Sequence, residues 1–185
     1  MGGSPFRVVR LFVAVELAGS GATRGDAPTH LTLKFLGEAD PVQVATISSA
    51  VADAVRPASP YELVLEGVGA FPSRARPRVV WVGVARGREA TIELARKVSD
   101  ALAPLGFPVE GEQFVPHVTL FRVRTPDQHR RALALLAGEE APPPPRTFVV
   151  EEVVLKESTL TARGAVHQTR GRFPLAGSPS VGPVG

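Results

Sequence analysis

The tetrapeptide HLTL at His30–Leu33 recurs in almost the same form as HVTL at His117–Leu120. Both copies lie in short apolar runs of the kind that form β-strands. Because residues i and i+2 of a strand point to the same face, each copy directs its histidine and threonine to one face and its two aliphatic side chains to the other. The repeat therefore predicts two strands, each with an imidazole and a hydroxyl on a polar face and with a core beneath the opposite face.

The sequence that follows each tetrapeptide is also repeated. Asp40-Pro41 and Thr125-Pro126 each combine a preferred N-cap residue with proline at the first helical position. The helices that begin there are expected to end at about Val55 and Ala137. The two units start roughly half of the chain apart. We therefore expect an α+β fold of two lobes in a bilobal, pseudo-twofold arrangement, each an antiparallel sheet with helices on its outer face.

The rest of the chain supplies further elements. Strands are expected at Arg7–Leu17, Tyr61–Glu66, Arg78–Ala85, Phe148–Lys156 and Ala165–Phe173, the last two as a hairpin. The first histidine strand should stop at Gly37, and an amphipathic helix should run from Arg88 to about Leu105. Irregular structure is expected at residues 18–29 and 67–77, and a stiff connector at the prolines 142–145. Residues 1–175 would then form one domain of two lobes, followed by a flexible tail at residues 176–185.

Composition excludes several kinds of site. The 185 residues contain no cysteine, which excludes disulfides, thiolate metal sites and cysteine nucleophiles and is compatible with a reducing cytoplasm. No apolar run approaches the roughly 20 residues of a membrane span, and charged residues interrupt the apolar start of the chain, so we expect neither a membrane helix nor a signal peptide. The net charge of +3, carried mostly by arginine, leans towards a phosphate-bearing partner.

A single His-x-Thr strand would be weak support for a site, because a half-buried histidine with locally satisfied ring nitrogens explains it equally well. Two copies in matched settings favour a paired site. Two imidazoles can move two protons, and neighbouring hydroxyls can hold an anion between them, as phosphodiester hydrolysis requires. The other two histidines have simpler interpretations: His129 lies on a charged helix and should be solvated, and His167, in the last strand without a threonine partner, should be structural.

The chain resembles the 2H phosphoesterases in four segments: HLTLKFLGE, GAFPSRARPRVVWVGV, FVPHVTLFRV and LKESTL…RGRFPL. Within that family it is most similar, from about Leu11 to Leu175, to the bacterial and archaeal RNA 2′,3′-cyclic phosphodiesterases formerly named 2′-5′ RNA ligases. The resemblance implies a bilobal α+β fold with a central cleft between the two sheets. It also implies hydrolysis of an RNA terminal 2′,3′-cyclic phosphate to a 2′-phosphate without metal or other cofactor. Relatives usually have a longer segment than residues 18–29 before the first histidine, so the wall of the cleft formed there is expected to differ.

The resemblance assigns roles to the residues of the two motifs. His30 would be the proton donor and His117 the proton acceptor, while Thr32 and Thr119 would bind phosphate oxygens. An ordinary histidine pKa near 6.5 allows both the neutral and the charged imidazole around neutrality. The motifs supply only two histidines, whereas a catalytic zinc ion usually has about three protein ligands, so metal hydrolysis is disfavoured.

The resemblance also suggests an aromatic residue five positions after the first histidine, here Phe35, which would stack on a base. It suggests an arginine five positions after the second histidine, here Arg122, at the phosphate. In a regular strand an odd offset points to the core side, so each strand would have to end or bulge before these residues. The alternative for Phe35 is an ordinary core position.

Arginines outside the motifs are the candidates for contact with the RNA backbone. The best are Arg74, Arg76 and Arg78, with Arg24 and Arg124 as outer candidates. The alternative for this cluster is a solvated surface, and Trp81 is expected to belong to the core rather than to a base platform.

Together these observations predict a cytoplasmic, monomeric, metal-independent RNA 2′,3′-cyclic phosphodiesterase. Three alternatives stay open. The same site could join ends through a 2′-5′ linkage, since that is the reverse reaction, or it could act on small cyclic nucleotides or on cyclic phosphates of ADP-ribose. The protein could also bind RNA ends without turnover, although a pure binder has no need for two titrating groups.

Overall fold

The computed structural model describes residues 8–17, 30–109, 111, 113–161 and 164–178, and the structural statements below concern these residues. The strands are β1 (Val9–Glu16), β2 (His30–Ala39), β3 (Tyr61–Ser73), β4 (Arg76–Arg86), β5 (His117–Arg122), β6 (Arg146–Val150), β7 (Glu152–Thr161) and β8 (Gly164–Pro174). The helices are α1 (Val44–Val55), α2 (Arg88–Leu102) and α3 (Pro126–Ala137), with short 3₁₀ helices η1 (Pro41–Gln43) and η2 (Ala103–Leu105). The loop expected at residues 18–29, with Arg24, lies outside the described residues.

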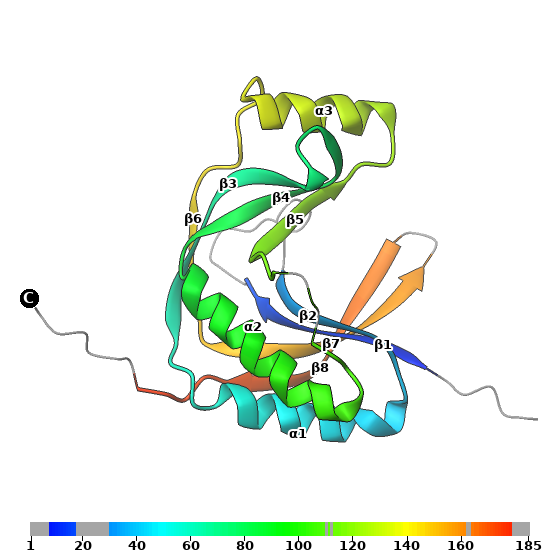
Figure 1. Cartoon of the computed structure of the whole chain (residues 1–185), viewed down its shortest axis with the longest axis vertical. Helices are drawn as coiled ribbons and strands as arrows, with labels where there is room; N and C mark the ends of the chain where they lie inside the picture. The colour runs from blue at the N-terminus through cyan, green and yellow to red at the C-terminus, as the bar shows by residue number, and fades with distance from the viewer. Residues whose placement is uncertain (1–7, 18–29, 110, 112, 162–163, 179–185) are drawn as a thin grey trace, which may run out of the picture.

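The strands form two antiparallel sheets of four strands each. The first sheet has the order β2-β1-β7-β8 and the second the order β5-β4-β3-β6. Each histidine strand is therefore an edge strand, paired with β1 in one lobe and with β4 in the other. This equivalence confirms the α+β, bilobal, pseudo-twofold arrangement expected from the duplicated motif (Figure 1).

Helices α1 and α2 lie side by side against the first sheet, where they contact β8 and β2 (Figure 1). Their apolar faces supply the centre of the core, including Ile47 and Val51 from α1 and Leu94 and Val98 from α2, each at most 1% exposed. Helix α3 lies at the opposite end of the molecule and contacts β3 and β4 (Figure 1). The helices thus cover the outer surfaces and leave the facing sides of the sheets to the site.

The two predicted N-caps are confirmed. The Asp40 side chain accepts a hydrogen bond of 2.9 Å from the Val42 amide, and the Thr125 hydroxyl accepts one of 3.2 Å from the Gln128 amide. In each case the glutamine at the third helical position, Gln43 or Gln128, closes a capping box. These caps end the strand-turn segments at fixed places and begin the helical segments that follow both histidine strands.

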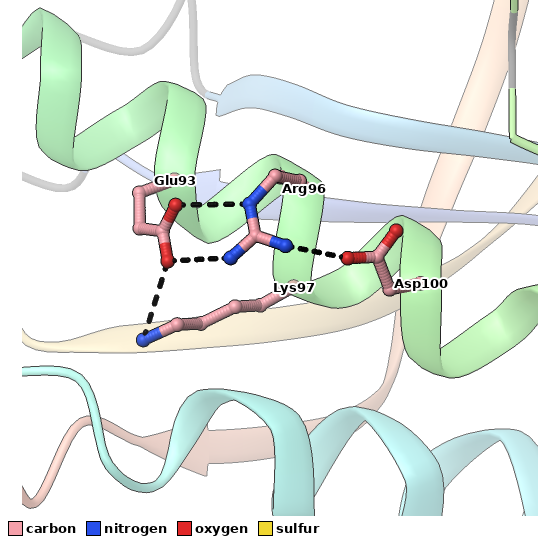
Figure 2. Close-up of polar contacts among 4 residues, drawn as sticks. All are labelled: Glu93, Arg96, Lys97 and Asp100. Carbon is pink, nitrogen blue, oxygen red and sulfur yellow. Dashed lines mark hydrogen bonds and ion pairs between the residues drawn. The ribbon is translucent and has the colours of Figure 1, made fainter.

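The exposed face of α2 carries a chain of ion pairs (Figure 2). Arg96 contacts Glu93 at 2.8 Å and Asp100 at 2.7 Å, and Lys97 reaches the same Glu93 at 3.8 Å. These partners are three or four positions apart, the spacing that brings helical side chains together. The helix is therefore amphipathic as predicted, with its charged face in solvent and its aliphatic face in the core.

Two strand predictions were wrong in part. Residues 67–77 were expected to be irregular, but β3 and β4 run through them as a long hairpin. Gly67, Gly69 and two prolines weaken the local strand signal. The hairpin accommodates these glycines and prolines because the pairing of β3 with β4 contains register shifts, and Gly67 adopts a φ of +79°. Similarly, β2 does not stop at Gly37 but continues to Ala39 past this residue at φ +71°.

The single strand predicted at Phe148–Lys156 is two strands in different sheets. β6 pairs with β3 in the second sheet, and β7 pairs with β1 and β8 in the first. The change occurs at Glu151, between the two strands. The hydrophobic pattern on either side of Glu151-Glu152 fits a strand, but it does not specify which sheet each part joins. The predicted terminal hairpin is present as β7–β8, and of the expected tail Ala176 and Gly177 donate backbone hydrogen bonds to Arg56 and Ala58.

Candidate active site

One cavity of about 1120 Å³ lies between the lobes and is lined by both motifs. β2 contributes His30 and Thr32, and β5 contributes His117 and Thr119. The two strands contact each other across the junction of the lobes. The structure thus brings to one cavity the four side chains that the duplicated tetrapeptide singled out.

The alternation of each motif explains this placement. Leu31 and Val118 lie between the histidine and the threonine of their strands and are 0% and 1% exposed, within the same core cluster. The hydrophobic side chains fix which face of each strand is inside. His30 and Thr32, or His117 and Thr119, must then point together to the opposite face.

A β-bulge follows each motif at the equivalent place. In the pairing of β1 with β2, Ala14 faces Thr32 and Val13 faces Lys34, so that Leu33 has no partner. Leu33 and Lys34 are consecutive and both buried, at 5% and 6% exposure. This extra residue returns Phe35 to the face of Thr32, where it lines the cavity with 61% of its surface exposed.

The second lobe repeats the arrangement. Trp81 faces Thr119 and Val80 faces Phe121, so that Leu120 has no partner, and Arg122 lines the cavity. The bulge required for Phe35 and Arg122 to reach the site is therefore present in both strands. The alternative of Phe35 as a core residue is wrong, since its side chain is mostly exposed.

The His117 ring is held by a hydrogen bond and by two aromatic rings. Its Nδ1 lies 2.7 Å from the carbonyl oxygen of Val115. The rings of Phe71 and Trp81 lie 4.9 and 5.8 Å away, centroid to centroid. Trp81 lies against Gly69, where a β-carbon would overlap its indole. Trp81 is thus a half-buried support beneath His117, and its Nε1 has no hydrogen-bond partner among the described residues.

The hydrogen bond to Val115 fixes the tautomer of His117. A carbonyl oxygen can only accept, so the neutral imidazole carries its hydrogen on Nδ1 and leaves the Nε2 lone pair available. Burial lowers the pKa of His117 below its ordinary value, opposed by the bond to Val115 and assisted by the charge of Arg122. The neutral ring can therefore accept a proton at Nε2.

His30 has a different environment. Its ring lies 5.1 Å from Phe12 and 5.3 Å, edge to face, from His167 on β8. Burial, and then the positive charges of His167 and Lys156, together lower the pKa of His30 to about 4, while Glu16 opposes them. His30 is therefore neutral near pH 7 in these surroundings, and it can donate a proton only after a change in them raises its pKa.

A charged network lies beside His30. Lys156 is 7% exposed and forms an ion pair of 2.5 Å with Glu16, which also contacts Arg172 at 2.9 Å. Burial alone would raise the pKa of Glu16, but Lys156 and Arg172 outweigh it and hold that pKa below its ordinary value. The carboxylate stays charged, and its register partner across β1 and β2 is His30.

His167 is the residue near the site that the sequence did not indicate. It was expected to be structural, yet its exposed imidazole contacts both Phe12, at 5.0 Å, and His30. The interpretation that His167 lacks a threonine partner was wrong, because His167-Gln168-Thr169 repeats the His-x-Thr spacing of the two motifs and places both side chains on one face of β8. That β8 reaches His30 depends on its pairing with β7 in the same sheet, which the local sequence does not specify.

The arginines suggested as RNA contacts lie elsewhere. Arg74, Arg76 and Arg78 are exposed but do not line the cavity. Arg74 donates to the carbonyl oxygen of Val68, at 3.1 Å, and to that of Leu136 in α3. Arg74 thus ties the β3–β4 hairpin to α3, and a contact of this cluster with RNA stays a prediction.

Two further features bear on the kind of site. Within the described part of the chain, no group of three or more His, Asp or Glu side chains is arranged to hold a metal ion. None of the helices in that part is long and apolar enough to cross a membrane.

Comparison with known proteins places this cavity in a family. The sequence profile described as the 2′-5′ RNA ligase superfamily matches residues 8–160. The chain belongs to this superfamily. The match includes both motif strands, both bulges and most of β7, and it confirms the resemblance recognised from the four sequence segments.

Relatives in the 2′-5′ RNA ligase superfamily carry a common name. Proteins named RNA 2′,3′-cyclic phosphodiesterase from Aeropyrum pernix and Methanothermobacter thermautotrophicus are 35% and 36% identical to the chain. These alignments cover 84% and 79% of this chain and 87% and 78% of the relatives. A relative of the same name from Geobacillus stearothermophilus is 33% identical over 81% of this chain, and the chain spans 46% of its length.

Solved structures agree with the fold. A crystal structure from Thermus thermophilus superposes with a TM-score of 0.69 at 26% identity and covers 91% of this chain and 98% of that one. Escherichia coli LigT in complex with 3′-AMP gives a TM-score of 0.66 at 26% identity, covering 91% and 99%. The two-sheet arrangement of Figure 1 is thus shared with members of known structure.

Proposed function

We propose that this protein hydrolyses the terminal 2′,3′-cyclic phosphate of RNA to a 2′-phosphate by acid–base catalysis with His30 and His117. The observation that carries the proposal is the meeting of both His-x-Thr pairs in one cavity. The names of the relatives from three organisms support the same substrate class. That the protein acts as a cytoplasmic monomer stays a prediction.

The reaction requires one proton to be removed and one to be delivered. A water oxygen bonds to phosphorus while a neutral imidazole takes its proton, and the P–O3′ bond breaks as the opposite imidazolium protonates O3′. The P–O2′ bond persists, so the product is a 2′-phosphate. The tautomer of His117, with hydrogen on Nδ1 and the lone pair on Nε2, supports this residue as the proton acceptor.

His30 is then the proton donor, and the bound phosphate prepares it for that role. In the structure the pKa of His30 is about 4 because burial and nearby cations disfavour the imidazolium. The negative charge of the cyclic phosphate reverses this balance, since an opposite charge within a few ångströms favours the protonated ring. Proton uptake by His30 would therefore accompany substrate binding.

The remaining residues bind the two ends of the substrate. The hydroxyls of Thr32 and Thr119 and the guanidinium of Arg122 would donate to phosphate oxygens and offset the charge that builds on them. The exposed ring of Phe35 on the opposite wall would stack on the terminal base.

The deciding experiment is product analysis with an oligonucleotide that ends in a 2′,3′-cyclic phosphate. We expect a 2′-phosphate in ³¹P NMR, with and without a 5′-hydroxyl acceptor strand and with or without EDTA. A joined product that accumulates with the acceptor would favour ligation, and unchanged substrate would favour a binding role. Activity lost in EDTA and restored by one divalent ion would overturn the two-histidine mechanism.

Variants test the residues. His30→Ala and His117→Ala should each reduce kcat/KM by about 10²–10⁴-fold, as expected for general acid–base groups. The double variant should lose little more, since groups that act as a unit are not additive. A substrate with an activated leaving group should rescue His30→Ala alone, because that group needs no protonation. His129→Ala, an exposed histidine on α3, is the matched control and should retain full activity.

A further inference from the structure

The cavity continues beyond the catalytic residues. Besides both motifs it is lined by Phe121, Arg131, Leu135 and Glu140 and by the segment 141–144. The four consecutive residues 119–122 all line the cavity, which means that the cavity extends past both faces of the edge strand β5. On the far side it reaches α3 and the proline connector. We call this part, formed by Phe121, Arg131, Glu140 and Pro142–Pro144, the α3 subsite.

The size of the cavity exceeds the need of the terminal nucleotide. Sites for drug-sized ligands, a class that includes a cyclic mononucleotide, usually have volumes of about 300–1,000 Å³. The cavity of about 1120 Å³ lies above this range. The histidines, the threonines, Phe35 and Arg122 have roles in the proposed chemistry, whereas the residues of the α3 subsite have none.

Arg131 is the cation of the α3 subsite. Its guanidinium lies over the Phe121 ring, 5.2 Å from the centroid, and its Nε donates to Glu140 at 3.0 Å. Its side chain is 60% exposed, and its two terminal amino groups have no hydrogen-bond partner among the described residues. A guanidinium fixed at Nε and free at its outer edge is arranged to bind a phosphate oxygen pair.

The proline connector forms the other wall. Pro142, Pro143 and Pro144 cannot donate backbone hydrogen bonds and hold φ near −65°, so this wall is apolar and loses little freedom when a ligand binds. The cavity thus combines apolar proline rings with an aromatic ring and the cation stacked on it, a set of side chains that suits a flat, weakly polar group. A nucleobase with the phosphodiester on the 3′ side of its ribose combines a flat apolar surface and an anion.

We propose that the α3 subsite binds the penultimate nucleotide of the RNA, with Arg131 on the phosphodiester that joins it to the terminal nucleotide. This inference rests on the proposed function, because it takes the terminal cyclic phosphate to lie between the two histidines. On this proposal the protein prefers an RNA end over a cyclic mononucleotide, and the residues responsible lie on α3 and the proline connector rather than in the Arg74–Arg78 stretch.

The test compares adenosine 2′,3′-cyclic phosphate with a diadenylate that ends in the same group. For the wild type we expect a higher kcat/KM on the dinucleotide. The ratio of the two kcat/KM values should fall at least about tenfold in Arg131→Gln, the size of one charged hydrogen bond. Arg131→Lys keeps the charge but loses the planar fork, and its ratio should lie between those of the wild type and Arg131→Gln.

Arg130→Gln is the matched control. Arg130 is the neighbouring arginine on α3, 74% exposed, paired with Asp127 and outside the cavity lining. Its ratio should equal that of the wild type. A ratio unchanged in Arg131→Gln, an equal fall in Arg130→Gln, or no difference between the Lys and Gln variants would each overturn the subsite. A wild type that fails to hydrolyse even the mononucleotide would instead refute the proposed function.

Discussion

Phe35 and Arg122 occupy equivalent positions in the two lobes. Each lies five residues after its histidine, and each returns to the cavity because a bulge, at Leu33 or at Leu120, takes up one residue of the strand. The pseudo-twofold axis thus sets an aromatic ring on one wall against a cation on the other. If the cavity binds a nucleotide as proposed, the base would lie on the wall of Phe35 and the phosphate on the wall of Arg122.

The first prediction concerns the aromatic wall. Phe35→Ala should lower kcat/KM on a cyclic nucleotide by about 5–150-fold, because base–aromatic stacking is worth about 1–3 kcal/mol per base. Since Phe35 is 61% exposed, its removal should change the melting temperature little. Ribose 2′,3′-cyclic phosphate, which has no base, is the control substrate. An equal loss on that substrate would show that Phe35 does not act through the base.

The second prediction concerns the pH profile. The pKa of His30 is about 4 and that of His117 lies below 6.5, and kcat/KM reports the free enzyme. The reactive form needs one neutral and one charged ring, so kcat/KM should be bell-shaped against pH. Its acid limb should lie near pH 4 and its basic limb at a pH lower than 6.5. The two apparent pKa values describe the histidine pair rather than either ring alone. The bound phosphate anion raises both pKa values, so the bell for kcat should lie at higher pH. A kcat/KM maximum above pH 7 would contradict this environment for His30.

The third prediction isolates His167. The charges of His167 and Lys156 lower the pKa of His30, so His167→Gln should raise that pKa. The acid limb of kcat/KM should therefore move to higher pH, while the basic limb changes little. His129→Gln, an exposed histidine on α3, is the matched control and should leave both limbs in place. An unmoved acid limb in the His167 variant would mean that its contact with His30 is only structural.

The fourth prediction concerns the support of His117. A β-carbon on Gly69 would overlap the indole of Trp81, which packs against His117. Gly69→Ala should therefore displace Trp81 and lower the free energy of unfolding by about 1–3 kcal/mol, as overpacking usually does. Thermal melting would measure the loss, and activity should fall with the displacement of His117.

Gly111→Ala provides the comparison for that variant, because a β-carbon there meets nothing within 4 Å. It should leave both stability and activity near the wild type. Equal melting temperatures for the two variants would show that the indole can move away from Gly69 without cost.

Much of the site could be predicted from the sequence, because its governing features are local. Alternation within His30–Leu33 and His117–Leu120 determines that each histidine shares a face with its threonine. The caps at Asp40 and Thr125 determine where the following helices begin. The duplication of these local units indicated two equivalent lobes, as the sheet orders confirm.

Other features depend on contacts between distant segments, and only the tertiary structure decided them. The segment 148–156 divides between two sheets at Glu151, where its first part pairs with β3 and its second with β1, and its composition does not specify these partners. His167 reaches His30 only because β8 joins the first sheet through β7. Hydrophobic pattern specifies which side of a strand is buried, whereas strand partners and the neighbours across a cavity follow from packing the whole chain.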